Sequence, residues 1–124
     1  MHKHIKNTNW ASTFTHACHG IRDTIKTERN FKVHLIAGIV AIGACVFFAI
    51  PPWQFALVGV AIFLVLITEL MNTAIEATID LVCDGKIHPL AKKAKDAAAA
   101  AVLMAAVFAL GVGAIIAASI LKGM

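Results

Sequence analysis

The chain has 124 residues, of which 60% are hydrophobic and 15% are charged, and its mean hydropathy is +0.82. These values exclude an average soluble domain. The formal net charge is +4, but the basic residues flank the apolar stretches, which argues against a nucleic-acid-binding protein.

Two long stretches carry no formal charge. No Asp, Glu, Lys or Arg occurs in residues 33–68 or in residues 97–121. Because a membrane-spanning helix needs roughly 20 apolar residues, the first stretch can hold two such helices and the second can hold one. The sequence therefore predicts an all-α membrane protein with three transmembrane helices, built as a single domain over residues 1–124.

The N-terminal part is more polar than the rest. Residues 1–9 are expected to be flexible because they are polar and terminal. Residues 10–28 form a predicted amphipathic helix, in which Trp10, Phe14 and Ile21 recur at helical spacing and basic residues fall on the other side. Such a helix is suited to the surface of a membrane.

The three predicted membrane helices follow in order. The first covers residues 33–50 and ends before Pro51, and His34 at its start is expected in the membrane interface. The second covers residues 53–83, which at 1.5 Å per residue is long enough to project beyond the bilayer core. The third covers residues 90–121.

The basic residues predict how the chain is oriented. They precede the first predicted membrane helix or lie between the second and third, as Arg22, Lys26, Arg29, Lys32, Lys86, Lys92, Lys93 and Lys95. The connection at residues 50–54 has no charge, and Lys122 alone lies near the C-terminus. The positive-inside rule therefore places the N-terminus and the 80–96 segment in the cytoplasm.

The second predicted membrane helix ends in a polar stripe. Offsets of 3, 7 and 11 residues place Glu69, Asn72, Glu76 and Asp80 on one helical face, near the depth where bilayer meets water. Carboxylates at that depth are costly and usually functional. They would also repel one another without a cation among them. The stripe therefore predicts part of a metal site, and it favours self-association that turns it away from lipid.

Other polar residues are expected at the same membrane level. Glu28 lies at the joint before the first span, and Lys95 and Asp96 lie at the wet end of the third. Carboxylates suit Mg²⁺, which shares substrate phosphates. Lys95 offers a point charge for phosphate, which Asp96 could orient, and a spare carboxylate could act as a general base toward an alcohol. Phosphoryl transfer needs these components.

Three motifs carry a resemblance to a known family. They are Glu28-Arg-Asn-Phe31, Glu69-x-x-Asn72-Thr-Ala-Ile-Glu76-x-x-x-Asp80, and His88-Pro-Leu-Ala-Lys-Lys-Ala-Lys95-Asp96-x-Ala-Ala. With them, the chain resembles the bacterial integral-membrane diacylglycerol kinase and undecaprenol kinase family from Phe14 through the third span. The resemblance implies a homotrimer in the bacterial cell membrane, with active sites at the cytoplasmic interface that draw on neighbouring subunits.

The resemblance also implies a role for each site position. Glu69 matches the catalytic base for the lipid hydroxyl, and Glu28 and Glu76 match the ligands of Mg²⁺ on the ATP phosphates. The implied nucleotide-binding positions are Glu28, Glu76, Lys86, Ile87, His88, Lys95 and Asp96. The implied supporting polar positions are Asn72 and Asp80, and the implied lipid-substrate positions are Glu69, Asn30, Phe31 and Ala99.

The predicted function is ATP-dependent phosphorylation of a membrane lipid alcohol. The segment from Asp84 to Asp96 resembles the undecaprenol kinase branch, so undecaprenol is the preferred acceptor and diacylglycerol the alternative. An alternative of another class is a non-enzymatic oligomeric pathway for ions or protons. Such a pathway needs ionisable groups through the membrane depth. Here they gather at the cytoplasmic end, which favours the kinase.

Overall fold

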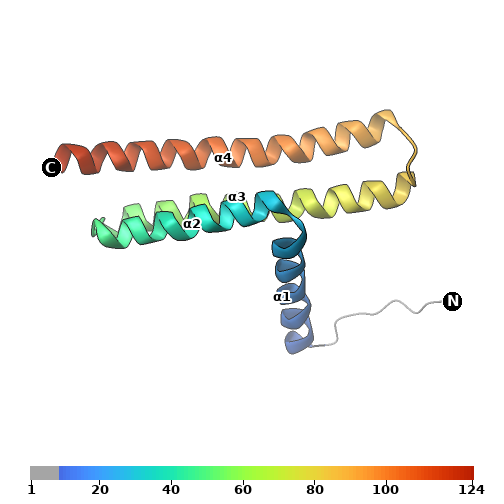
Figure 1. The fold of residues 1–124 in the computed structure, drawn as a ribbon, viewed down its shortest axis with the longest axis horizontal. Coiled ribbons are helices and arrows are strands. Elements are labelled where there is room, and N and C mark those ends of the chain that lie inside the picture. Colours follow the sequence, from blue (N-terminus) through green and yellow to red (C-terminus); the bar gives the residue numbers. More distant parts are fainter. Residues whose placement is uncertain (1–8) are drawn as a thin grey trace.

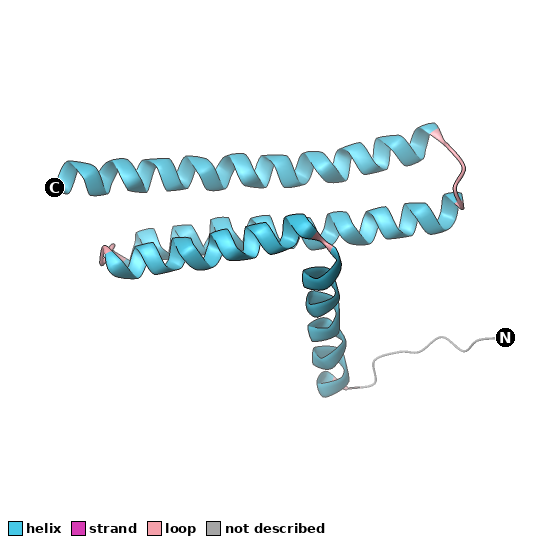
Figure 2. Ribbon diagram, in the orientation of Figure 1, coloured by secondary structure: helices cyan, strands magenta, loops and turns pink. Residues whose placement is uncertain are grey.

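The computed structural model describes residues 9–124, and the predicted flexible start at residues 1–9 falls outside this part except for Asn9. All regular structure in the described part is helical, as Figure 2 shows. The elements are α1 (Trp10–Thr27), α2 (Arg29–Phe47), α3 (Pro52–Cys83) and α4 (Pro89–Gly123). The last three are long and apolar enough to cross a membrane. The predicted all-α fold is confirmed, and the protein is a multi-pass membrane protein.

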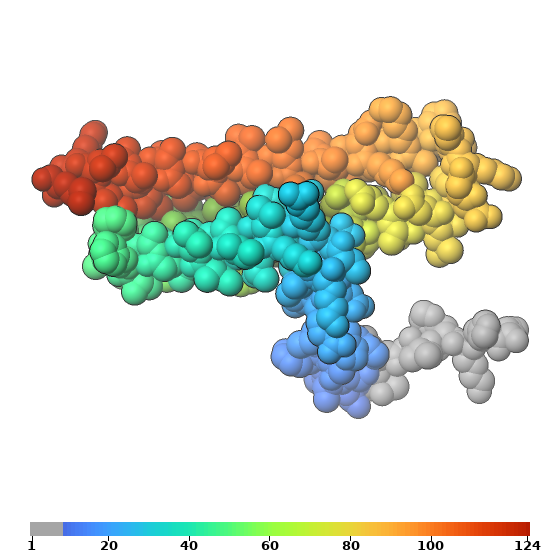
Figure 3. Space-filling view, in the orientation of Figure 1, coloured from blue at the N-terminus to red at the C-terminus, as the bar shows by residue number. Residues whose placement is uncertain are grey.

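Helix α1 begins and ends at clear local signals. The Asn9 side chain accepts a hydrogen bond from the Ser12 backbone N–H at 2.7 Å, which caps the first turn. At the other end Glu28 adopts an extended conformation, with φ −107° and ψ 108°, which separates α1 from α2. The two helices therefore point in different directions, and α1 projects away from the bundle in Figures 1 and 3.

Helix α2 differs from the predicted range of residues 33–50, because it begins at Arg29 and ends at Phe47. Its C-terminus is closed by two hydrogen bonds, from Ala49 N–H to Val46 O and from Ile50 N–H to Cys45 O. Ala49 has a positive φ of 51°, which cannot continue a helix. Ile50 precedes a proline, and this position also disfavours helical geometry.

Helices α3 and α4 form a long antiparallel hairpin. Helix α3 ends where Asp84 and Gly85 take left-handed conformations, with φ values of 46° and 80°. Helix α4 then starts at Pro89, and the His88 ring accepts a hydrogen bond from the Leu90 backbone N–H at 3.1 Å. The two helices begin at Pro52 and Pro89, each one residue before the predicted starts at 53 and 90.

Helix α3 is the centre of the three-helix bundle. It packs against both α2 and α4, whereas no backbone contact joins α2 to α4 within residues 9–124. A small apolar cluster ties the three helices together, made of Cys45, Val58, Ala61, Val112 and Ile116. Many large apolar side chains on α2, α3 and α4 remain exposed in the single chain, as expected of helices that face lipid.

Candidate functional site

The polar stripe lies on α3 near the start of α2. Figure 1 shows that α2 runs beside the first part of α3 only, while the last part of α3 continues beside α4. This arrangement gives the stripe two environments. Glu69 is buried, and Glu76 and Asp80 are exposed. The two kinds of carboxylate are therefore suited to different chemistry.

Glu69 lies against a histidine of α2. The His34 Nε2 atom is 3.3 Å from Glu69 Oε1, and the exposed fractions of the two side chains are 29% and 7%. The sequence interpretation placed His34 in the membrane interface and missed this contact. A signal was present, because His34 is the only histidine in the otherwise uncharged stretch of residues 33–68.

Asn72 connects the next two turns of the stripe. Its Nδ2 atom donates a hydrogen bond to Glu76 Oε1 at 3.1 Å. Its Oδ1 atom is buried and has no hydrogen-bond partner within residues 9–124. Buried acceptors are nearly always satisfied in folded proteins, so this oxygen marks a position where a ligand or a bound ion can supply the missing partner.

Two ion pairs lie where α3 and α4 approach the connecting loop. Lys95 Nζ donates to Asp80 Oδ1 at 2.6 Å, which joins α4 to the stripe. Lys92 Nζ donates to Asp96 Oδ2 within α4. Lys95 and Asp96 are neighbours in sequence but have different partners. Exposed pairs of this kind contribute about 0–1 kcal/mol to stability. Their importance for function is therefore that they fix the positions of the charged groups.

The remaining predicted positions lie at the corner between α1 and α2, in α2, in the loop between α3 and α4, and in α4. Glu28 is partly exposed at the corner between α1 and α2. In the first turn of α2, Asn30 is exposed and Phe31 is buried. The other positions are exposed, namely Lys86, Ile87 and His88 in the loop and Ala99 on α4. Within residues 9–124, no hydrogen bond or ion pair joins Glu28 or these loop side chains to the stripe.

The carboxylates of the stripe fit Mg²⁺ only if substrate phosphates and water complete its coordination. Among the residues that the structure describes, no three His, Cys, Asp or Glu side chains gather closely enough to hold a metal alone. Mg²⁺ is usually bound through one or two carboxylates together with substrate phosphates and water. Glu76, beside the unsatisfied Asn72 Oδ1 atom, matches that requirement.

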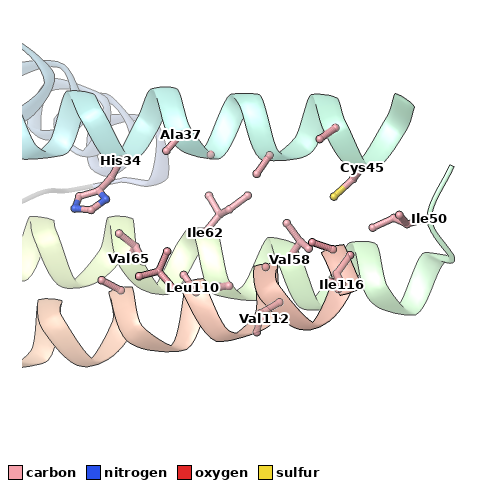
Figure 4. Close-up of a pocket in the computed structure, with 18 of the residues that line it drawn as sticks. His34, Ala37, Cys45, Ile50, Val58, Ile62, Val65, Leu110, Val112 and Ile116 are labelled. Atoms are coloured by element: carbon pink, nitrogen blue, oxygen red, sulfur yellow. The ribbon is translucent and has the colours of Figure 1, made fainter. Parts of the chain in front are cut away.

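An apolar groove lies between α2 and α4, with α3 as its floor (Figure 4). Its volume is about 520 Å³, and the residues labelled in Figure 4 that line it include His34, Ala37, Cys45, Ile50, Val58, Ile62, Val65, Leu110, Val112 and Ile116. The floor residues Val58, Ile62 and Val65 share the helical face that continues to Glu69. The groove therefore leads toward the buried carboxylate, with His34 at that end. Nothing in the sequence interpretation anticipated it.

Comparison with known proteins assigns the chain to a family. Residues 15–117 match the family model of prokaryotic diacylglycerol kinase. An undecaprenol kinase of Bacillus subtilis is 46% identical over 108 residues, which cover 84% of each chain. A diacylglycerol kinase of Synechocystis is 39% identical over 105 residues, which cover 85% of this chain and 60% of that relative. A diacylglycerol kinase of Pseudomonas aeruginosa is 35% identical over 86 residues, which cover 69% of each chain.

These matches confirm the resemblance that the three motifs indicated. The matched segment contains the stripe, the corner residue Glu28 and the Lys95–Asp80 pair. An enzyme, and not a passive pathway, is the interpretation that the matches favour. The chain belongs to the prokaryotic diacylglycerol kinase family and is a membrane lipid kinase.

Proposed function

We propose that the protein transfers the γ-phosphate of ATP to undecaprenol at the cytoplasmic face of the bacterial cell membrane. The observation that carries this proposal is the position of Glu69, a buried carboxylate on the same α3 face as the floor of the apolar groove. A lipid alcohol can place its hydroxyl at Glu69 while its hydrocarbon chain stays in an apolar environment. The similarity to a protein named undecaprenol kinase supports this acceptor.

In the proposed reaction, Glu69 accepts the proton of the lipid hydroxyl. The hydroxyl oxygen forms a bond to the γ-phosphorus as the bond between that phosphorus and the leaving ADP oxygen breaks. General-base assistance of this kind contributes about 10²- to 10⁴-fold to rate. Burial beside apolar side chains keeps water away from the acceptor position, which favours transfer to lipid over hydrolysis.

The exposed part of the stripe is proposed to bind the nucleotide. Glu76 and Glu28 would hold Mg²⁺, which supplies neutralisation of charge on the ATP phosphates. Asn72 orients Glu76 through their hydrogen bond, and Asp80 orients Lys95 toward the same end of α3. The remaining proposed contacts to nucleotide come from Lys86, Ile87 and His88 in the loop and from Asp96.

The proposed lipid-substrate positions and the proposed assembly complete this site. Asn30, Phe31 and Ala99 lie on the helices that flank the stripe, in the first turn of α2 and in α4. Glu76 and Asp80 are exposed in the single chain, and three helices alone do not enclose them. We therefore propose a homotrimer, with α1 lying on the membrane surface and the stripes covered by neighbouring subunits.

Diacylglycerol remains the second candidate acceptor, because relatives from Synechocystis and Pseudomonas aeruginosa are named diacylglycerol kinases. The two acceptors differ in shape, since undecaprenol has one long chain and diacylglycerol has two. A comparison of turnover on the two lipids separates them. If diacylglycerol is phosphorylated faster, the kinase assignment stands and the undecaprenol proposal is wrong.

The test supplies purified protein with Mg²⁺, γ-labelled ATP and either lipid alcohol. We expect label in undecaprenol, and we expect Glu69→Gln to lower transfer by at least about 100-fold while ATP still binds. Equal turnover in Glu69→Gln would rule out its role as the base. Absence of label in every lipid alcohol, together with ion flux in vesicles, would instead support a non-enzymatic pathway for ions or protons.

A further inference from the structure

We propose that His34 is a positioning residue for Glu69. In this role the His34 Nε2–H donates to Glu69 Oε1 and leaves Oε2 free to accept the proton of the lipid hydroxyl. The inference rests on the proposed role of Glu69 as the base. It assigns to α2 the residue that contacts the buried carboxylate of α3.

Glu69 is a buried carboxylate that needs a polar partner. Among the described residues, Glu69 is the only buried acidic side chain. Thr24 is the only other buried polar residue among them. Burial of a carboxylate beside apolar groups is costly unless a partner compensates. Within residues 9–124, His34 is the only side chain at ion-pair distance from Glu69, and no side chain donates a hydrogen bond to Glu69 in the free chain. His34 is therefore the available partner.

His34 lies on a part of α2 that packs closely against α3. One turn before it, Phe31 is buried, with an exposed fraction of 3%. One turn after it, Gly38 lies so close to α3 that a Cβ atom there would be 2.8 Å from the Ile62 Cγ2 atom. The α2 backbone thus lies close to α3 one turn after His34, and a buried side chain precedes His34 by one turn. Figure 4 shows the imidazole ring between the two helices at the end of the apolar groove.

The separation of the two atoms suits this role. At 3.3 Å, the Nε2 to Oε1 distance is that of an ion-pair contact and is longer than the about 2.7–2.9 Å of a charge-assisted hydrogen bond. Catalytic hydrogen bonds are often long without substrate and tighten in the complex. A lone Glu carboxylate rotates readily about its terminal torsion. A donor fixed on α2 restricts that rotation and presents the second oxygen to the acceptor.

The test compares two substitutions of nearly equal size, His34→Met and His34→Gln. Both fill the space of the ring, but only the glutamine amide can still donate to Glu69. Because a hydrogen bond to a charged group contributes roughly ten- to a hundredfold, we expect His34→Met to lower kcat by about that factor with little change in the KM for lipid. We expect His34→Gln to stay within about threefold of the native kcat. Equal kcat values in the two variants would overturn the proposal, as would a change confined to KM.

A further comparison separates this inference from the role of Glu69 itself. If Glu69→Gln is inactive while His34→Met keeps native turnover, the base assignment stands and the positioning role fails. If both roles hold, adding His34→Met to Glu69→Gln causes no further loss, because residues that act as a unit are not additive. A second full loss in the double variant would show that His34 acts elsewhere.

A spectroscopic measurement tests the contact without any turnover. In protein labelled with ¹⁵N-histidine, the His34 resonances are those missing from His34→Gln, and they report which ring nitrogen carries a proton. We expect the proton on Nε2, and we expect the Nε2 resonance to move when Glu69 is replaced by Gln. An unprotonated Nε2 atom would overturn the inference, even if no lipid is phosphorylated. An Nε2 resonance with the same chemical shift in Glu69→Gln would also overturn it.

Discussion

Glu69 and Glu76 lie two turns apart on one face of α3, yet the structure surrounds them differently. Glu69 is buried at the end of an apolar groove, whereas Glu76 is exposed and accepts a hydrogen bond from Asn72. Two carboxylates with different surroundings can take different roles in one reaction. The buried group is suited to proton transfer from a lipid, and the exposed group is suited to a metal shared with phosphate.

The proposed metal role of Glu76 leads to a binding prediction. Glu76→Gln keeps the size of the side chain but removes its charge, so it should weaken Mg²⁺-dependent ATP binding by about tenfold or more, which is about 1.4 kcal/mol. Titration calorimetry with ATP, in the presence and absence of Mg²⁺, measures this loss. ATP affinity without Mg²⁺ should change much less.

Asp23→Asn provides the matched control for Glu76→Gln. Asp23 is exposed on α1, and its substitution removes the same unit of charge away from the stripe. ATP binding in this variant should match the native protein. A metal requirement that is unchanged in Glu76→Gln would refute the ligand role, and an equal loss in both variants would point to a general effect of net charge.

At the scale of the elements, the sequence predicts the helices better than the contacts between them. Apolar stretches, Pro51 and the Asp84–Gly85 pair mark where helices end, because each has a local physical cause. The start of α2 at Arg29 was missed, because Glu28 alone adopts the extended conformation that separates it from α1. One residue of irregular backbone leaves little trace in composition.

The same contrast holds within the candidate site. Helical periodicity correctly places Glu69, Asn72, Glu76 and Asp80 on one element, α3. It does not show which neighbouring helix covers which turn of that element. The contact of Glu69 with His34, the pair of Asp80 with Lys95 and the apolar groove all depend on how helices pack, so they required coordinates.

The close approach of α2 and α3 at Gly38 gives a prediction at this scale. In Gly38→Ala the new Cβ atom would lie 2.8 Å from Ile62 Cγ2, so the Ile62 side chain or α2 must move. Overpacking of this kind costs typically about 1–3 kcal/mol. We expect a lower thermal midpoint in detergent, measured by circular dichroism, and partial recovery when Ile62→Ala is added.

Gly43→Ala is the matched control for this test. Gly43 lies on the same helix, and none of the described residues comes within 4 Å of a Cβ atom built there. Both substitutions share the gain in helix propensity of about 1 kcal/mol, so the difference between them isolates the clash at Gly38. Equal midpoints for the two variants would show that α2 can shift without cost, and would weaken the case for a rigid placement of His34.

At the scale of the whole molecule, the two ends of the bundle differ in charge. Figure 1 shows the turn between α2 and α3 at the same end as the C-terminus, and the loop between α3 and α4 at the other end. Among the residues that the structure describes, the first end has Lys122 as its only basic residue, whereas the second carries Lys86, Lys92, Lys93 and Lys95. The structure thus separates the chain into a basic end with the candidate site and a nearly uncharged end. Such a separation is typical of a membrane protein with a fixed orientation.

That asymmetry predicts which end faces the cytoplasm, and single cysteines can test it. In a variant whose native cysteines are replaced by serine, Lys86→Cys and Gln54→Cys each introduce one exposed or partly exposed thiol, at opposite ends of α3. A membrane-impermeant maleimide should label position 86 only in inverted vesicles and position 54 only in right-side-out vesicles. ATP is a cytoplasmic substrate, so the reverse pattern would place the candidate nucleotide site where no ATP is available, and the proposed reaction would be wrong. Labelling of both positions from one side would contradict the assignment of α3 as a membrane-spanning helix.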